Sequence, residues 1–303
     1  MSKSNRRSLL GTESLSPEEI QGLLRLARRM QSGKPRPLLR DKRVGLLFYE
    51  ASTRTRVSFE YAAKALGAQT AVITAVASSI EKGESVIDTG YTVRALGADC
   101  IVMRHPSSGA PHLMARHLDI PVINAGDGMH EHPTQALLDA YTILKHKPKI
   151  AGLRVVIVGD IYHSRVARSA VYLLTKLGAQ IVLCGPPELA PEVAGTLAPN
   201  VTVTRHLESA LRGADVVMML RIQKERLGTL QLRLDDYIGY YQLTQERLKL
   251  ARRDVLVMHP GPMIRGLEIT AEVADGPQSV IREQVESGVY VRMAALATCM
   301  GAA

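Results

Sequence analysis

The sequence predicts an α/β protein of two lobes, each a mainly parallel sheet flanked by helices, with the active site in the crevice between them. Short apolar runs alternate with amphipathic helical stretches along nearly the whole chain, which is typical of βα units and parallel sheets. The length of 303 residues suits about two domains. A composition that is 46% hydrophobic and 22% charged indicates buried cores rather than disorder.

The first lobe begins with a helix that Ser16 and Pro17 open and that ends near Gly33. Apolar runs then alternate with helical periodicity, so the strands of this lobe are expected to lie parallel. The expected strands cover residues 44–49, 70–76, 100–103 and 121–124. The expected helices between them cover residues 53–66, 86–96 and 112–117.

A helix over residues 134–145 joins the two lobes, and a last apolar helix over residues 279–300 is expected to pack back on the first lobe. The expected strands of the second lobe cover residues 154–158, 180–184, 201–204, 216–220 and 255–258, with helices between most of them. The predicted domains are 1–133 plus 284–303, and 134–283.

The formal net charge of +9 raises nucleic acid as a partner. The sequence has no recognition-helix motif and no zinc-finger spacing, and only 4% of its residues are aromatic and able to stack on bases. We therefore expect no nucleic-acid partner. The excess of positive charge equally favours the capture of small anionic substrates.

The sequence also predicts a cytoplasmic protein with no membrane partner. Its apolar runs are far shorter than the roughly 18 to 20 residues that cross a bilayer, and residues 1–10 lack the apolar core of a secretory signal. Cys100, Cys184 and Cys299 lie far apart in apolar segments and form no CxxC pair. We interpret them as reduced structural cysteines.

Hydroxyl and arginine side chains open the helix that follows the first strand, in the order Ser52, Thr53, Arg54, Thr55 and Arg56. The first turn of a helix has free N–H groups and a positive dipole end, so this segment predicts an anion site, with phosphate the obvious anion. The alternative is an ordinary Ser/Thr cap with solvated arginines. The pattern alone does not separate the two.

Two further clusters support the anion site. Arg104 directly follows the buried strand over residues 100–103, where a strand end meets the crevice in α/β folds. A turn-rich loop over residues 126–135 brings His132 and Gln135 to the start of a helix.

No metal and no organic cofactor are expected. His130 and His132 with Glu131 suggest a metal site, but no further ligand set accompanies them. Residues 159–165 follow a strand where a dinucleotide phosphate loop would lie, yet they lack the GxGxxG pattern.

Arginines also follow strands of the second lobe. Arg165 opens a helix that faces the crevice, and Arg221 with Gln223 follows the strand over residues 216–220. Two such arginines can each clamp a carboxylate by two-point contacts. The alternative is that they form structural ion pairs with Asp160 or Glu225.

Three motifs occur in the order and approximate spacing of the carbamoyltransferase family, and together they resemble its aspartate branch. The motifs are Ser52-Thr53-Arg54-Thr55-Arg56, His132-Pro133-Thr134-Gln135 and His259-Pro260-Gly261-Pro262. The resemblance covers essentially the whole chain. It implies a carbamoyl-phosphate-binding domain (1–133 plus 284–303) and an aspartate-binding domain (134–283), in a homotrimer with shared active sites.

The implied reaction transfers the carbamoyl group of carbamoyl phosphate to the amino group of L-aspartate, an early step of de novo pyrimidine biosynthesis. The resemblance assigns the phosphate to Ser52, Thr53, Arg54 and Thr55, and the carbonyl oxygen to Thr55, Arg104 and His132. It assigns the carbamoyl NH₂ to Gln135 and the Pro260 carbonyl, in the turn that continues through Gly261 and Pro262. It leaves open whether a regulatory chain or a dihydroorotase associates.

The resemblance also implies an aspartate site of Lys82, Arg165, Arg221 and Gln223, and a catalytic set of Arg54, Thr55, Lys82, Arg104 and His132. Ser78 and Lys82 match positions that enter the neighbouring subunit's site. From the pattern alone, Lys82 is a solvated turn lysine.

Two rival functions remain. The ornithine branch typically has a cysteine in its His-Cys-Leu-Pro turn, where this chain has residues 259–262, and it needs an acidic group for the ornithine side-chain amine. A non-catalytic scaffold of the same fold is the other rival. It would be indicated by the loss of Arg54, Lys82, Arg104 or His132, and all four are present.

Overall fold

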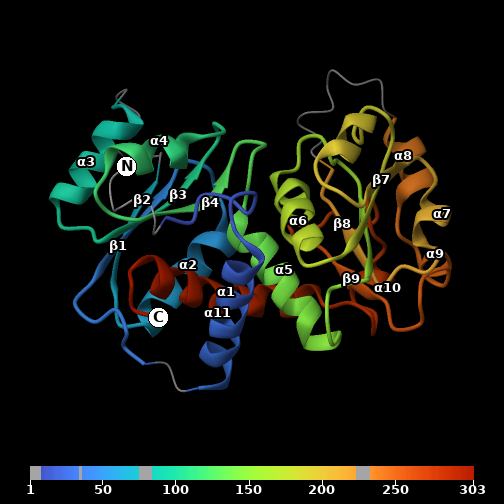
Figure 1. Cartoon of the computed structure of the whole chain (residues 1–303). Helices are drawn as coiled ribbons and strands as arrows, with labels where there is room; N and C mark the ends of the chain where they lie inside the picture. The colour runs from blue at the N-terminus through green and yellow to red at the C-terminus, as the bar shows by residue number, and fades with distance from the viewer. Residues whose placement is uncertain (1–7, 34–35, 75–83, 223–232) are drawn as a thin grey trace. The chain divides into compact units, whose positions relative to one another are not determined.

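The computed structural model describes residues 8–33, 36–74, 84–222 and 233–303 (Figure 1). The chain divides into two compact units. The first unit consists of Met1–Tyr141 and Val285–Ala303, and the second of Thr142–Gln284. Each unit contains a parallel sheet flanked by helices, which confirms the predicted α/β class with two lobes.

The sheet of the first unit has the strand order β2-β1-β3-β4, and all its pairs are parallel. Its strands are β1 (Arg43–Phe48), β2 (Gln69–Thr74), β3 (Cys100–His105) and β4 (Val122–Asp127). Helices α3 (Val86–Ala95) and α4 (Ala110–His117) lie on one face, and α1 (Pro17–Ser32), α2 (Thr53–Ala65) and α11 (Ile281–Cys299) lie on the other (Figure 1). Because helices cover both faces of the sheet, every residue of β4 is buried.

Helix α1 begins and ends where the sequence predicts. The Ser16 hydroxyl accepts a hydrogen bond of 3.2 Å from Glu19 N–H, and the Glu19 carboxylate accepts one of 2.8 Å from Ser16 N–H. This capping box satisfies donors that the helix itself cannot pair. At the other end, Gly33 is the C-cap and its N–H bonds the Arg29 carbonyl.

The sheet of the second unit has the strand order β7-β6-β5-β8-β9 and is also parallel. Its strands are β5 (Arg154–Val158), β6 (Gln180–Cys184), β7 (Val201–Thr204), β8 (Val216–Met219) and β9 (Leu256–Met258). Its helices are α6 (Arg165–Lys176), α7 (Leu207–Leu211), α8 (Leu234–Tyr241), α9 (Gln245–Leu248), α10 (Ala271–Ala274) and the 3₁₀ helix η3 (Glu192–Thr196). Helix α5 (Pro133–His146), like α11, has residues in both units.

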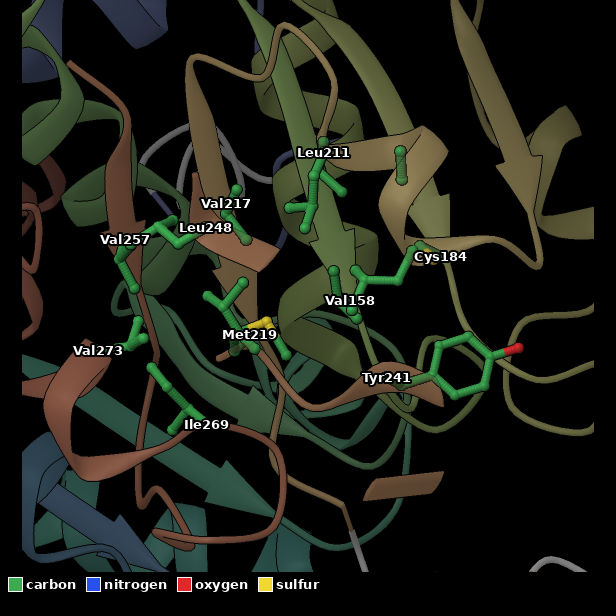
Figure 2. Close-up of a cluster of buried hydrophobic side chains, with 14 of the residues drawn as sticks. Val158, Cys184, Leu211, Val217, Met219, Tyr241, Leu248, Val257, Ile269 and Val273 are labelled. Atoms are coloured by element: carbon green, nitrogen blue, oxygen red, sulfur yellow. The ribbon is translucent and has the colours of Figure 1, made fainter. Parts of the chain in front are cut away.

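One face of this second sheet carries a continuous apolar core. Figure 2 shows Val158, Met219 and Val257, from three neighbouring strands, with Leu248 and Tyr241 from the helices that cover them. These side chains are 7% exposed or less. The strand pairing sets the register of β5, β8 and β9, and this core packs against one face of them.

Most predicted elements are found within two residues of their expected ends. The expected end of the strand over residues 70–76 lies outside the described residues. The strand predicted for residues 121–124 is an exception, because β4 continues to Asp127. Gly126 has a φ of 113°, and the pairing register with β3 shifts before His105 pairs with Asp127. The glycine therefore adopts a conformation typical of turns while it remains part of the strand.

Cys100, Cys184 and Cys299 are free and buried, as predicted. Burial raises the pKa of the Cys184 thiol to about 12. Among the residues described, no helix combines the length and apolarity needed to cross a bilayer.

Candidate active site

The N-terminus of α2 presents hydroxyl and N–H groups just beyond the end of β1. Ser52 is the N-cap, and its hydroxyl accepts a hydrogen bond of 3.4 Å from Thr55 N–H. Thr53 and Arg54 are exposed, whereas Thr55 is buried. The first turn contains no acidic side chain, so the positive end of the helix dipole is not offset and this site can bind a phosphate-sized anion.

Arg104 lies at the carboxyl end of β3, beside the end of β1. Its backbone carbonyl accepts a hydrogen bond of 2.9 Å from Tyr49 N–H. Its guanidinium Nη1 donates to the Ala125 carbonyl at 3.3 Å, and Nε lies 3.4 Å from the Glu50 carboxylate. With the side chain only 14% exposed, these contacts hold a positive charge at the sheet edge from which α2 starts.

The loop after β4 carries His132 and Gln135 to the start of α5. Both side chains are buried, and the His132 carbonyl accepts a hydrogen bond of 3.0 Å from Gln135 N–H. Glu131, beside them, accepts hydrogen bonds from Thr12 N–H at 2.7 Å and from the Thr12 hydroxyl at 2.6 Å. Because β1, β3 and β4 are neighbours, the first unit brings the start of α2, Arg104 and this loop to one edge of its sheet.

The same loop contributes to a group that could hold a metal ion. His112, Asp127 and His130 each place one ligand atom within 4.8 Å of the others. Asp127 is already bonded, because one of its oxygens accepts from Gly109 N–H at 2.7 Å and the other from the Asn124 amide at 2.8 Å. Burial and, less strongly, the neighbouring His130 lower the pKa of His112. The sequence pattern suggests His130 with residues 131 and 132 instead of this group, whose members come from two segments, α4 and the end of β4 with its following loop.

The second unit places candidate residues at the carboxyl ends of neighbouring strands. Strands β5 and β8 are paired, as are β8 and β9, and Leu220 N–H donates to the Val158 carbonyl at 2.8 Å. The segments that lead to Arg165, to Arg221 and to residues 259–262 therefore leave one edge of this sheet.

Arg165 is the first residue of α6, and Arg221 lies two residues after β8. Both side chains are partly exposed. Asp160, which sequence analysis considered as an ion-pair partner, is buried, and its Oδ1 lies 2.9 Å from Nδ1 of His163. The other partner considered, Glu225, lies outside the described residues. Both arginines follow strands that end at one edge of this sheet.

The His259 side chain is hydrogen-bonded to the turn Pro260-Gly261-Pro262 that follows it. Its Nδ1 accepts a hydrogen bond of 2.8 Å from Gly261 N–H, and its Nε2 lies 3.1 Å from Oε1 of Glu268. Because Nδ1 acts as an acceptor, Nε2 carries a proton and donates to Glu268. Both side chains are buried, while Pro260 and Gly261 are partly exposed and Pro262 is exposed.

Three predicted site residues, Ser78, Lys82 and Gln223, lie outside the described residues. The others are divided between the units. The first unit contains Ser52, Thr53, Arg54, Thr55, Arg104, His132 and Gln135, and the second contains Arg165, Arg221, Pro260, Gly261 and Pro262.

Two buried polar contacts that support these edges were not predicted from the sequence. One is the contact of His259, named above only within its motif, with Glu268. The other is that of Arg292 of α11, whose Nη1 donates to the Ser58 hydroxyl at 2.7 Å. A single arginine within the otherwise apolar stretch 289–297 was a usable signal, because charged side chains are rarely buried without partners.

The fold and its two sheet edges define a class of protein: a two-unit α/β protein that binds small anionic molecules where parallel strands end. Two family models match the chain. "Aspartate/ornithine carbamoyltransferase, carbamoyl-P binding domain" matches residues 7–145, and "Aspartate/ornithine carbamoyltransferase, Asp/Orn binding domain" matches residues 151–299. The chain belongs to the aspartate/ornithine carbamoyltransferase family.

Curated relatives agree with this assignment. The chain is 63% identical over 300 residues to the aspartate carbamoyltransferase catalytic subunit of Koribacter versatilis, covering 99% of each chain. It is 53% identical over 298 residues to the corresponding subunit of Solibacter usitatus, covering 97% of this chain and 99% of that one. These relatives confirm the recognition of the family and of its aspartate branch from sequence, and the predicted carbamoyltransferase class.

Solved structures share the whole fold. Ornithine carbamoyltransferase from Pyrococcus furiosus superposes with a TM-score of 0.87 at 31% identity, covering 97% of both chains. Aspartate transcarbamoylase from Trypanosoma cruzi, in complex with carbamoyl aspartate and phosphate, gives a TM-score of 0.85 at 31% identity and covers 95% of this chain and 94% of that one. Both branches therefore have this architecture, and the site residues must account for the choice of substrate.

Proposed function

We propose that this carbamoyltransferase transfers the carbamoyl group of carbamoyl phosphate to the amino group of L-aspartate, releasing N-carbamoyl-L-aspartate and phosphate. The observation that carries the proposal is the edge of the first sheet, where the uncompensated start of α2, Arg104 and the His132 loop follow neighbouring strands. The identity to curated aspartate carbamoyltransferases supports the choice of aspartate.

The chemistry requires positive groups at two places. When the amine attacks the carbamoyl carbon, negative charge develops on the carbonyl oxygen, and phosphate then leaves with further charge. In this proposal the phosphate ligands are Ser52, Thr53, Arg54 and Thr55. Thr55, Arg104 and His132 polarise the carbonyl oxygen. No covalent enzyme intermediate is needed.

The carbamoyl NH₂ donates hydrogen bonds, so it must be oriented by acceptors. We assign this role to the Gln135 side-chain oxygen and the Pro260 carbonyl, in the turn that continues through Gly261 and Pro262. Gln135 is suited to it because its NH₂ group donates to Asp139 at 2.9 Å, which fixes its amide orientation.

L-Aspartate has two carboxylates, and Arg165 and Arg221 offer two guanidinium groups for them. Lys82 and Gln223 complete the proposed aspartate site, and Ser78 and Lys82 are proposed to enter it from a neighbouring subunit of a homotrimer. A cytoplasmic location and a place in pyrimidine biosynthesis fit this reaction. Co-purification tests whether a regulatory chain or a dihydroorotase associates with this chain.

The test is an assay of phosphate release from carbamoyl phosphate with either L-aspartate or L-ornithine. We expect release, together with carbamoyl aspartate, only with aspartate. Turnover with ornithine instead would assign the chain to the other branch. No turnover with either amine would favour the non-catalytic scaffold. Sedimentation of the active protein measures whether it is a trimer.

A further inference from the structure

Arg292, in the middle of α11, is buried within the first unit, with only 3% of the residue exposed. A buried guanidinium loses its hydration, and a well-packed apolar side chain at such a position often gives equal or greater stability. Its presence therefore calls for a role beyond holding the core together.

Arg292 contacts α2, the helix whose first turn forms the proposed phosphate site. Its Nη1 donates a hydrogen bond of 2.7 Å to the Ser58 hydroxyl, and its guanidinium carbon lies 5.1 Å from the centre of the Phe59 ring. The Ser58 hydroxyl in turn donates to the carbonyls of Arg54 at 2.6 Å and Thr55 at 3.0 Å. One buried hydroxyl thus joins Arg292 to the backbone of two proposed phosphate ligands.

Arg292 is also electrostatically linked to α5. Burial lowers the pKa of Arg292 to about 10. The charge of Asp139 acts against that effect and the charge of Arg104 adds to it, and the guanidinium stays positive near pH 7. Asp139 is fully buried, and its Oδ1 accepts the hydrogen bond from the Gln135 amide.

The backbone of α11 leaves room for this arrangement. Gly288 lies one turn before Arg292, and a Cβ atom at that position would collide with Nη1 of Arg292 and lie 3.3 Å from Leu138 Cδ2. Glycine is less favourable than alanine in the middle of a helix. Its presence here gives the guanidinium the space it needs to reach Ser58.

We propose that Arg292 is a positioning residue for carbamoyl phosphate, which sets the first turn of α2 through the Ser58 hydroxyl. It touches neither substrate. The inference rests on the proposed function, because that function places Arg54 and Thr55 on the phosphate and Gln135 on the carbamoyl group. A shift of this turn moves the phosphate relative to the carbamoyl group, which is costly for a reaction that depends on alignment.

The first test compares Arg292→Met with Arg282→Met. Arg282 belongs to the same helix, but its side chain is 92% exposed, so it controls for the substitution itself. We expect Arg292→Met to raise the KM for carbamoyl phosphate and the Kd for inorganic phosphate, measured by calorimetry, by about 10-fold to 100-fold. The KM for aspartate at saturating carbamoyl phosphate should change much less, and Arg282→Met should match the wild type.

Ser58→Ala supplies the second test, because it removes only the hydroxyl between Arg292 and α2. We expect it to weaken phosphate binding in the same direction, and the double variant with Arg292→Met to be no worse than the worse single variant, since both changes break one connection. Thermal unfolding of each variant checks that it is folded. Should Arg292→Met fail to fold, Ser58→Ala alone decides the matter.

Unchanged phosphate binding in folded Arg292→Met or Ser58→Ala would overturn the proposal, as would additive effects in the double variant. Phosphate binding needs no aspartate turnover. A wild-type protein that binds phosphate but does not carbamoylate aspartate would therefore contradict the proposed function, while the role of Arg292 would still be measured.

Discussion

The Nε2 atom of His259 lies 3.1 Å from Oε1 of Glu268, and both side chains are buried in the second unit. The same Glu268 oxygen accepts a hydrogen bond of 2.6 Å from Ile264 N–H. His259 and Glu268 therefore both accept hydrogen bonds from the backbone of the turn that presents the Pro260 carbonyl.

Replacing this histidine should cost stability. His259→Leu removes the hydrogen bonds of His259 to the buried Glu268 carboxylate and to Gly261 N–H, so we expect the free energy of unfolding to fall by about 2 to 4 kcal/mol. Urea denaturation measures the change, with the exposed His206→Leu as control. Equal stability of the two variants would show that the turn is held by other contacts.

Arg54→Ala should nearly abolish turnover while leaving the fold intact. Removing a preorganised charge from the leaving phosphate costs transition-state stabilisation, roughly 10²-fold or more in kcat. The exposed Arg40→Ala is a matched control and should retain normal kinetics. Near-normal kcat in the Arg54 variant would contradict the phosphate assignment.

Arg221→Ala should raise the KM for L-aspartate and lower kcat, with little change in the affinity for carbamoyl phosphate. A small dicarboxylate depends on charge-assisted two-point contacts for its orientation, and a misplaced amine loses the benefit of proximity. Steady-state kinetics with each substrate varied in turn checks this, with the exposed Arg212→Ala as control. An equal fall in affinity for both substrates would place Arg221 elsewhere than in the aspartate site.

Mixing two inactive variants tests the shared site. If Lys82 acts across a subunit boundary, Lys82→Ala chains dissociated and reassembled with Arg54→Ala chains should regain partial activity, because some interfaces then pair two intact halves. Activity is measured before and after reassembly, with each variant reassembled alone as control. Mixtures as inactive as their parents would indicate a site contained in one chain.

Chelators should have no effect on turnover. The carboxylate of Asp127 already accepts hydrogen bonds from Gly109 and Asn124, and its contact with His130 at 3.1 Å is an ordinary hydrogen-bond distance. Activity is compared before and after EDTA treatment and dialysis. Loss of activity that one divalent ion restores would identify His112, Asp127 and His130 as a metal site.

The fold could be predicted because its signals are local. Apolar runs of strand length alternate with helical periodicity, and the ends of elements such as α1 carry caps that can be recognised from a few residues. The contacts that support the candidate site join residues far apart in the sequence. Ser58 and Arg292 are 234 positions apart, and no periodicity or spacing relates a hydroxyl on one helix to a guanidinium on another.

The boundary at residue 124 was wrong for a related reason. Gly126 and Gly128 indicate a turn, yet β4 continues because Asn124 and Asp127 bond to each other and to groups from other segments. The side chains named by motif were easier to predict, since helix starts and strand ends in parallel α/β folds face the same edge.

The contact between Thr12 and Glu131 sets a limit for protein engineering at the start of the chain. Leu9 pairs with β4, and Thr12 binds the carboxylate of the residue next to His132, so this leading segment is part of the scaffold that supports a proposed catalytic side chain. A fused domain or affinity tag attached ahead of Ser8 leaves these bonds in place. A deletion that reaches Thr12 removes both the pairing of Leu9 with β4 and the two hydrogen bonds that Thr12 donates to the buried carboxylate beside His132.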